Sequence, residues 1–486
     1  MADAIASTSM GLNNSKWNDS RKIFDTLKMM AKTPDNRSKI SSLNFDQAQQ
    51  FLASCEKVLS SQATVLMGKT LVSCLEAVTE ALRFLRNSSA GVPQNQEYIV
   101  TKGVIQQVMK ITHTLLRPHF QESDEINTVN ETIKIAIQLI GNVTVGNSLT
   151  QESIWKQCYP NFFLSVMTSA SLQIQNCMCM VIYNSMTSQQ RLDLVSSHQG
   201  LKIMSQILHL CSDHDELEWG YFIVETLVKN GHTGDLYKGM EFDPSARIVL
   251  LDLIQVHLAG SNSDSSSLEP STPAISQWSV PDESLVFLAD EFERISDTFF
   301  QKKFDCLTAE NMLDALLIAR LLSLLSKATA LHLSALQNHI QLLQKALDLL
   351  HQTNKPQNRD RFSNTSSVPQ SHDSGKLSPT HGFKRDLVRL IGNMCYQHRL
   401  NQDQVRIKEG IPLLLDHCNI DDHNPYICQW AVFAIRNLLE NNIENQKIVA
   451  ELEKQGLADN SKLHQFGVDI KETEQGGINI VQKSKS

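Results

Sequence analysis

The chain has 486 residues, of which 41% are hydrophobic and only 20 are Gly, so it carries enough apolar side chains to bury a sizeable core. Its formal net charge of −8 argues against a surface built to neutralise many phosphates, so we expect no nucleic-acid partner. Ten Cys stand without regular spacing, and the N-terminus lacks a basic region followed by an apolar core. Both features favour a reducing, cytoplasmic location with free thiols.

Helical periodicity begins after a small, polar stretch at residues 1–20, where we expect a mobile tail. From residue 21 to 259 the pattern recurs in units whose last helix ends with Asn. These signature residues are Asn87, Asn142, Asn184 and Asn230. Apart from a first separation stretched by an insertion, their spacing fits the about 40 to 47 residues of armadillo and HEAT units.

Two segments interrupt this array. Residues 260–284 and 353–382 are rich in Ser, Asn, Pro and Gly, cannot bury enough surface to offset their ordering entropy, and are predicted to be disordered loops. Within them Thr272 and Ser378 each precede Pro and are predicted phosphorylation sites. Between them, residues 285–352 show helical patterning without the signature Asn, which predicts one degenerate repeat. No stretch reaches the roughly 18 uninterrupted apolar residues of a membrane span.

Residues 383–452 hold two further copies of the pattern and precede a polar C-terminal tail at 453–486. Their last helices end at Asn393 and Asn437. In the second copy the apolar residues recur at i, i+3, i+4 and i+7, which predicts a helix with one wide core-facing stripe, and Trp430 falls within it. We therefore predict that Trp430 is buried.

The start of this last helix is predicted from a cap. Asn424 can accept a hydrogen bond from a free N–H, and Pro425 in the first turn loses no needed donor. The helix is therefore predicted to begin near Pro425.

The recurrent Asn allows two interpretations. In the first, its amide bonds the backbone of a neighbouring repeat and fixes the stacking angle. In the second, the Asn ladder lies along the concave groove and pairs with the main chain of a bound peptide. Armadillo proteins that read basic import signals also place Trp one turn before the Asn, and none stands there in this chain.

The second interpretation predicts a partner-binding surface on the last two repeats. Side chains at i, i+4 and i+8 share one helical face, and Arg can pair a carboxylate while Phe supplies apolar area. The predicted binding residues are Arg385, Arg389, Asn393, Phe433 and Asn437. The Arg pair and the missing Trp favour an acidic or mixed ligand over a Lys-rich one.

Motifs that would indicate chemistry are incomplete. Gly68-Lys69-Thr70 ends like a phosphate loop, but its first Gly position is Ala63 and the segment is helical in pattern. Cys418, His423 and Cys428 match half of a zinc-knuckle spacing, without the further Cys that a four-ligand site needs. The sequence thus predicts no catalytic residue, no cofactor and no metal, and the chain is not expected to be an enzyme.

The Asn-ended third helix resembles the armadillo repeat, and residues 383–448, with the run GIPLLLDHCNIDDHNPYICQWAVFAIRNLLENNIENQ, closely resemble the C-terminal domain of the ataxin-10 family. The N-terminal array and both Ser-rich insertions extend the resemblance over essentially the whole chain. It implies a scaffold linked to neuronal survival and neurite outgrowth through Ras/MAP-kinase signalling, and to cytokinesis. It also implies a G-protein β subunit and O-GlcNAc transferase as partners, and a perinuclear, midbody, centrosome or ciliary-base location besides the cytoplasm.

The sequence as a whole predicts an all-α, armadillo-like helical-repeat superhelix, an α-solenoid with two disordered insertions, that acts as a non-enzymatic scaffold for protein–protein interaction. The alternative is a G-protein regulator, an exchange factor or chaperone built on the same array. Nucleotide-exchange assays would separate the two. The sequence leaves self-association into a homo-oligomer open.

Overall fold

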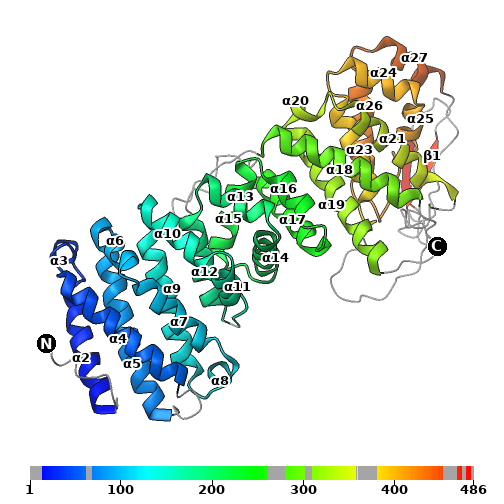
Figure 1. Ribbon diagram of the computed structural model, residues 1–486. Coiled ribbons are helices and arrows are strands. Elements are labelled where there is room, and N and C mark those ends of the chain that lie inside the picture. Colours follow the sequence, from blue (N-terminus) through cyan, green and yellow to red (C-terminus); the bar gives the residue numbers. More distant parts are fainter. Residues whose placement is uncertain are drawn as a thin grey trace. The chain divides into compact units, whose positions relative to one another are not determined.

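A computed structural model describes residues 14–61, 68–169, 171–260, 280–301, 309–356, 358, 380–452, 468–472 and 478–482. The chain divides into an N-terminal unit, Met1–Leu253 with Trp278–Ser284, and a C-terminal unit, Ile254–Gln277 with Leu285–Ser486. Apart from one short sheet, every regular element is an α-helix (Figure 1). The predicted all-α helical-repeat fold is confirmed.

The first sixteen helices that the structure describes end at residue 260. They are α2 (Asn14–Met30), α3 (Pro34–Arg37), α4 (Ser42–Ser61), α5 (Gly68–Ser89), α6 (Pro93–Thr101), α7 (Val104–Leu115), α8 (Pro118–Gln121), α9 (Ile126–Thr144), α10 (Ser148–Cys158), α11 (Asn161–Met167), α12 (Leu172–Ser185), α13 (Ser188–Ser196), α14 (His198–Asp213), α15 (Glu218–Lys229), α16 (Thr233–Gly239) and α17 (Pro244–Gly260). The chain is helical from Asn14, earlier than the predicted tail boundary at residue 20.

The remaining elements follow the first predicted loop. They are α18 (Asp282–Gln301), α19 (Ala309–Leu331), α20 (Leu333–Leu336), α21 (Ile340–Asn354), α23 (Phe383–Met394), α24 (Arg399–Ile407), α25 (Gly410–Leu415), α26 (Ile427–Leu439), α27 (Ile443–Glu451), β1 (Val468–Glu472) and β2 (Ile478–Gln482). The strands pair antiparallel, with Ile470 opposite Ile480, inside the segment predicted as a polar tail. None of the described helices combines the length and apolar character that crossing a membrane requires.

Third helices form the spine of each unit. In the N-terminal unit α2, α5, α9, α12 and α15 pack in that order, and in the C-terminal unit α19, α23 and α26 do the same. Each buries an apolar stripe between its neighbours, which is why a repeat depends on the next for its core. The six signature Asn lie at the ends of α5, α9, α12, α15, α23 and α26.

Two helix boundaries are set by residues in the left-handed region. Gly382, at φ 74°, precedes α23, a conformation that costs Gly no steric strain. Tyr426, at φ 67°, precedes α26, which begins at Ile427 rather than near Pro425. The prediction that Asn424 caps α26 was therefore wrong. Asn424 is fully buried, and its Oδ1 accepts hydrogen bonds from the backbone N–H groups of Lys384 and Arg385 in α23.

Both predicted Ser-rich loops begin within described helices. Gly260 is the last residue of α17, and Thr353 lies buried in α21. Most of the two loops, with Thr272 and Ser378, lies outside the described residues.

Candidate functional site

Three of the six signature Asn side chains bond backbone carbonyls in the preceding third helix. Asn142 Nδ2 donates to Arg86 O at 3.0 Å, and Asn437 Nδ2 donates to Gly392 O at 2.9 Å. Asn393 Nδ2 donates to Ser326 O at 3.2 Å and to Thr329 Oγ1 at 3.1 Å. Arg86 O and Gly392 O lie in the last turns of α5 and α23, where carbonyls have no donor within the helix, so Asn142 and Asn437 cap one repeat with the next.

Two of the predicted partner-binding residues make these bonds. Asn393 is 7% exposed and Asn437 is 2% exposed, and both amides already donate within the protein. They cannot reach the main chain of a bound peptide without breaking these bonds. Of the two interpretations of the Asn ladder, the geometry here is that of repeat stacking.

The other three signature residues behave differently. Asn87 Oδ1 accepts from the guanidinium of its neighbour Arg86 at 3.3 Å, and Asn184 is half-buried. Asn230 is exposed, caps α15, and donates to Thr226 O in its own helix at 2.7 Å. The Asn pattern therefore marks helix ends throughout, but not a continuous ladder.

A second amide motif was missed in the sequence. An Asn-Gln pair stands eight and nine residues after Asn87 and Asn393, as Asn95-Gln96 and Asn401-Gln402. The Asn donates back to the end of its preceding third helix, as from Asn401 to Met394 O at 2.8 Å. The Gln of these two pairs donates forward to the next third helix, as from Gln402 to Asn437 O at 2.9 Å. A third pair, Asn445-Gln446, follows Asn437 at the same spacing, and its exposed Gln446 donates back to Leu439 O at 2.8 Å. The repetition of the Asn-Gln dipeptide at this spacing was the sequence signal that could have revealed the motif.

A cluster of cations lies on the third helices of the C-terminal unit. Arg389, with 13% of its side chain exposed, donates from Nε to Ser326 Oγ at 3.1 Å and lies 3.3 Å from Asp386 Oδ1. Arg385, 25% exposed, donates from Nε to the same carboxylate at 2.8 Å. Lys327 on α19 is half-buried beside them. We call Lys327, Arg385 and Arg389 the cation cluster, which has three positive charges around one buried carboxylate.

Burial and the crowding of like charges lower the pKa values of two cations in the cluster. Burial lowers the pKa of the Lys327 ammonium below its ordinary value, and the nearby Arg389 and Arg385 lower it further against the opposing effect of Asp386. Burial also lowers the pKa of the Arg389 guanidinium, which Asp386 opposes. An anion placed beside Lys327 would relieve this repulsion.

Aromatic side chains border the cation cluster on α26. The guanidinium of Arg389 lies over the Trp430 ring, 5.5 Å from its centroid, and Trp430 meets Phe433 edge-on at 5.7 Å. Both rings are half-buried. The prediction that Trp430 is a core residue was therefore wrong, since its ring covers Arg389 on the surface of the third helices.

The turn between α25 and α26 gathers the residues of the incomplete zinc motif. Cys428 Sγ donates to Cys418 O at 3.0 Å, and His423 Nε2 lies 2.9 Å from Thr380 Oγ1. Burial lowers the pKa of His423 and raises that of Cys418. Within the described residues, no group of three or more His, Cys, Asp or Glu side chains could hold a metal ion.

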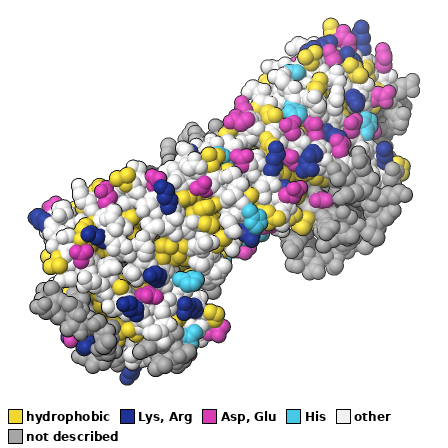
Figure 2. Space-filling model, in the orientation of Figure 1, with side chains coloured by type: hydrophobic (Ala, Val, Ile, Leu, Met, Phe, Trp, Pro, Cys, Tyr) yellow, Lys and Arg dark blue, Asp and Glu magenta, His cyan; other side chains and the backbone are white. Residues whose placement is uncertain are grey.

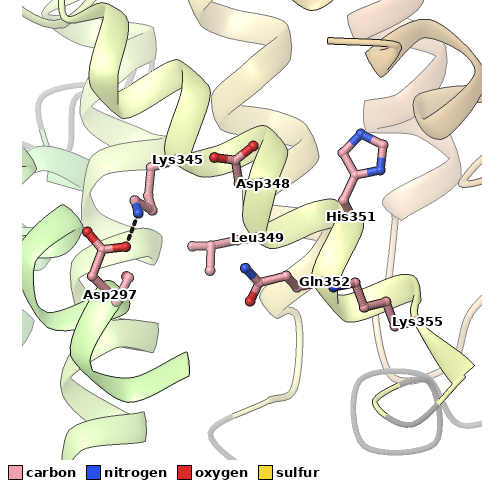
Figure 3. Close-up of a pocket in the computed structure, with 8 residues that line it drawn as sticks. Asp297, Lys345, Asp348, Leu349, His351, Gln352 and Lys355 are labelled. Carbon is pink, nitrogen blue, oxygen red and sulfur yellow. Dashed lines mark hydrogen bonds and ion pairs between the residues drawn. The ribbon is translucent and has the colours of Figure 1, made fainter. Parts of the chain in front are cut away.

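The Gly68-Lys69-Thr70 triplet opens α5, while Ala63 lies outside the described residues. A polar hollow of about 460 Å³ is lined by α18 and α21. Figure 3 shows the side chains that line it. Lys345 pairs with Asp297 across it, and Asp348 lies 3.6 Å from Lys408 Nζ. Its charges neutralise one another, so the cation cluster remains the stronger candidate.

Comparisons with known proteins point to one family. A family model described as the spinocerebellar ataxia type 10 protein domain matches residues 383–481. The chain is similar to ataxin-10 of Bos taurus, 33% identical over 428 residues, which cover 86% of this chain and 84% of the relative. Ataxin-10 of Homo sapiens is 32% identical over the same shares. The ataxin-10 homolog of Dictyostelium discoideum is 45% identical over 111 residues, 22% of this chain and 18% of the relative.

Among solved structures, the chain is similar to an engineered protein, with a TM-score of 0.30 and 14% identity over 90% of this chain and 98% of that one. It is also similar to a structure from work on a phosphorylation switch between cadherin and beta-catenin, with a TM-score of 0.35 and 11% identity over 92% and 70%. TM-scores this low carry no argument, so the fold assignment rests on the helices described above.

Proposed function

Since the chain belongs to the ataxin-10 family, we propose that it is a non-enzymatic scaffold that binds an acidic segment of a partner protein on the third helices of its C-terminal unit. The carrying observation is the excess of positive charge in the cation cluster, three cations around Asp386, beside the half-buried rings of Trp430 and Phe433. Aromatic and Arg side chains dominate the energy of protein interfaces.

Each member of this surface has its own part. Lys327 carries the charge that an incoming carboxylate or phosphate would neutralise, because Arg385 and Arg389 already share the Asp386 carboxylate. Arg389 is bonded to Ser326 and covered by Trp430, so it positions the ring rather than the ligand. Phe433 adds apolar area beside it.

The finer roles implied by the family resemblance belong to this proposal. They are neurite outgrowth and neuronal survival through Ras/MAP-kinase signalling, cytokinesis, and binding of a G-protein β subunit and O-GlcNAc transferase. A cytoplasmic and perinuclear location and a homo-oligomeric state belong to it as well.

A titration that reads each Trp separately tests the binding surface. The full chain holds five Trp, and labelling with 5-fluorotryptophan gives each a fluorine resonance that a Trp→Phe variant assigns. The probe is a peptide of alternating Glu and Phe. We expect the Trp430 resonance to shift saturably, and Lys327→Glu to weaken binding at least about fivefold. Weaker binding at higher ionic strength should accompany it.

The matched control is Lys447→Glu on α27, an exposed Lys of the same unit that undergoes the same charge reversal away from the cation cluster. It should keep the wild-type affinity. A Trp430 resonance unmoved by the peptide, or equal weakening by both variants, would place the partner elsewhere.

A further inference from the structure

At two of the six signature positions the residue directly before the Asn is Gly, and the next third helix lies close to it. A Cβ on Gly141 would lie 2.3 Å from Met180 Cε, the flexible end of a side chain on α12, and a Cβ on Gly392 would lie 2.9 Å from the Cβ of Ala434 on α26. A side chain at position 392 would push α26 away, whereas Met180 can move aside from one at position 141. In α12 the same position holds Tyr183.

Tyr183 contacts two aromatic rings of α15. Its ring centroid lies 5.5 Å from Trp219 and 5.9 Å from Phe222, and those two rings meet edge-on at 5.7 Å. We call Tyr183, Trp219 and Phe222 the aromatic cluster. All three rings are half-buried rather than enclosed. Figure 2 shows hydrophobic side chains gathered over the middle of the N-terminal unit, where α9, α12 and α15 lie.

An acidic segment borders this cluster. The end of α14 and the turn into α15 carry exposed carboxylates directly before Trp219, which is the second residue of α15. They form the acidic rim: Asp213, Asp215, Glu216 and Glu218. None of the ion pairs found among the described residues includes a member of the rim, in contrast to the paired acids Glu76, Glu80 and Glu131 on α5 and α9.

We propose that the aromatic cluster and the acidic rim form a second docking surface, for a basic amphipathic segment of a partner protein. Trp and Tyr give large contact area at low entropic cost and attract Lys and Arg through their ring faces. The rim carboxylates pair with the same cations and select them against acidic segments. This surface goes beyond the proposed function, since it lies in the other unit and takes a ligand of opposite charge.

The charge of the rim decides between occupants. An acidic segment would meet four like charges beside Trp219, and a purely apolar one would leave them without partners. Only a segment with Lys or Arg next to apolar residues satisfies both parts of the surface. The aromatic cluster therefore provides the apolar contact area, and the acidic rim indicates that the ligand is positively charged.

The test uses the full chain labelled with 5-fluorotryptophan and a peptide with Lys and Leu at helical spacing, compared with the same peptide in which Glu replaces Lys. We expect the Lys peptide to shift the Trp219 resonance and the Glu peptide to leave it in place. Asp215→Lys combined with Glu216→Lys should weaken binding of the Lys peptide at least tenfold.

A matched double variant controls for net charge. Glu122→Lys with Asp124→Lys makes the same change at two exposed acids of the N-terminal unit, before α9, and should keep the affinity within twofold. All four positions are exposed, so neither variant threatens the fold. The proposal would be overturned if the Lys peptide left the Trp219 resonance unshifted or if the Glu peptide shifted it equally. It would also be overturned if both double variants weakened binding of the Lys peptide equally. Trp430 reports the cation cluster separately, so failure at one surface is distinguishable from failure at the other.

Discussion

Replacing Asn437 by Ala should destabilise the C-terminal unit, because its amide caps the end of α23. Backbone bonds from Cys395 and Tyr396 reach Ile391 O and Asn393 O, which leaves Gly392 O between them to the Asn437 amide. Asn437 is 2% exposed, so water cannot replace the lost donor. An unsatisfied buried carbonyl costs about 1–3 kcal/mol, and we expect the loss to fall in that range.

The assay is urea unfolding of the full chain, followed at the Trp430 fluorine resonance for the C-terminal unit. Asn437→Asp should cost more than Asn437→Ala, since it places an acceptor against the acceptor Gly392 O. The matched control is Asn230→Ala, followed at Trp219. Asn230 holds the same signature position, but it is exposed and bonds its own helix, so its loss should stay within about 0.5 kcal/mol. Equal losses for Asn437→Ala and Asn230→Ala would refute the cross-repeat cap.

Four further outcomes are expected. Gln402→Ala should cost about 1–3 kcal/mol in urea unfolding, whereas Gln446→Ala, an exposed counterpart, should stay within about 0.5 kcal/mol. Trp430→Ala should cost about 1–2 kcal/mol, less than the about 3–5 kcal/mol of Trp155→Ala, whose ring is 4% exposed. Burial lowers the pKa of His417 below 6.5, so the unfolded chain binds that proton more tightly and stability is lost as the pH falls through 6.5; His417→Asn, which can keep a bond to Leu413 O, should flatten that loss between about pH 7 and 5. A proline-directed kinase should add phosphate at Thr272 and Ser378, and mass spectrometry of Thr272→Ala and Ser378→Ala should show one site fewer each.

The repeat architecture could be predicted because its signals are local. Apolar periodicity marks each helix, and the recurrent Asn marks the end of each third helix. The bonds themselves are not local: Asn437 reaches Gly392 and Gln402 reaches Asn437 across repeats. Sequence alone could therefore place the Asn at a helix end but could not decide between a bound peptide and a neighbouring carbonyl.

The cap at Asn424 failed for the same reason. An Asn followed by Pro is a good local start signal, yet the buried Asn424 side chain serves α23, which begins about 40 residues earlier in the chain. The sequence correctly predicted that Asn424 caps a helix N-terminus but assigned it to the wrong helix, because the tertiary structure brings the start of α23 within reach of its side chain.

Trp430 shows a different limit. Periodicity says which residues share a face, but not whether another element covers it. Val388 and Val432 both stand five residues before a signature Asn, yet Val388 on α23 is buried at 0% exposure and Val432 on α26 is 58% exposed. The third helix α26 covers α23, and no further third helix follows α26 among the described residues. The face that carries Val388 in α23 and Val432 in α26 is thus core in one repeat and surface in the last, whereas most of the predicted stripe around Trp430 is buried (Ile427, Ala431, Ala434 and Leu438).

The residue before the signature Asn differs among the repeats, and at Tyr183 it contributes to a proposed binding surface. Where it is Gly392, the next third helix packs closely against the backbone and its Asn437 amide reaches Gly392 O. Asn142 reaches Arg86 O in the same way, although Arg86 is the residue before Asn87. Where it is Tyr183, rings from α15 contact it, and Asn230 at the end of α15 bonds only its own helix. Tyr183 therefore supplies aromatic area at the surface of two repeats whose later signature amide, Asn230, stays within its own helix. Arg86 shows that the amide contact does not require a small residue, so the particular effect of Tyr183 is the apolar contact area that a docking surface requires.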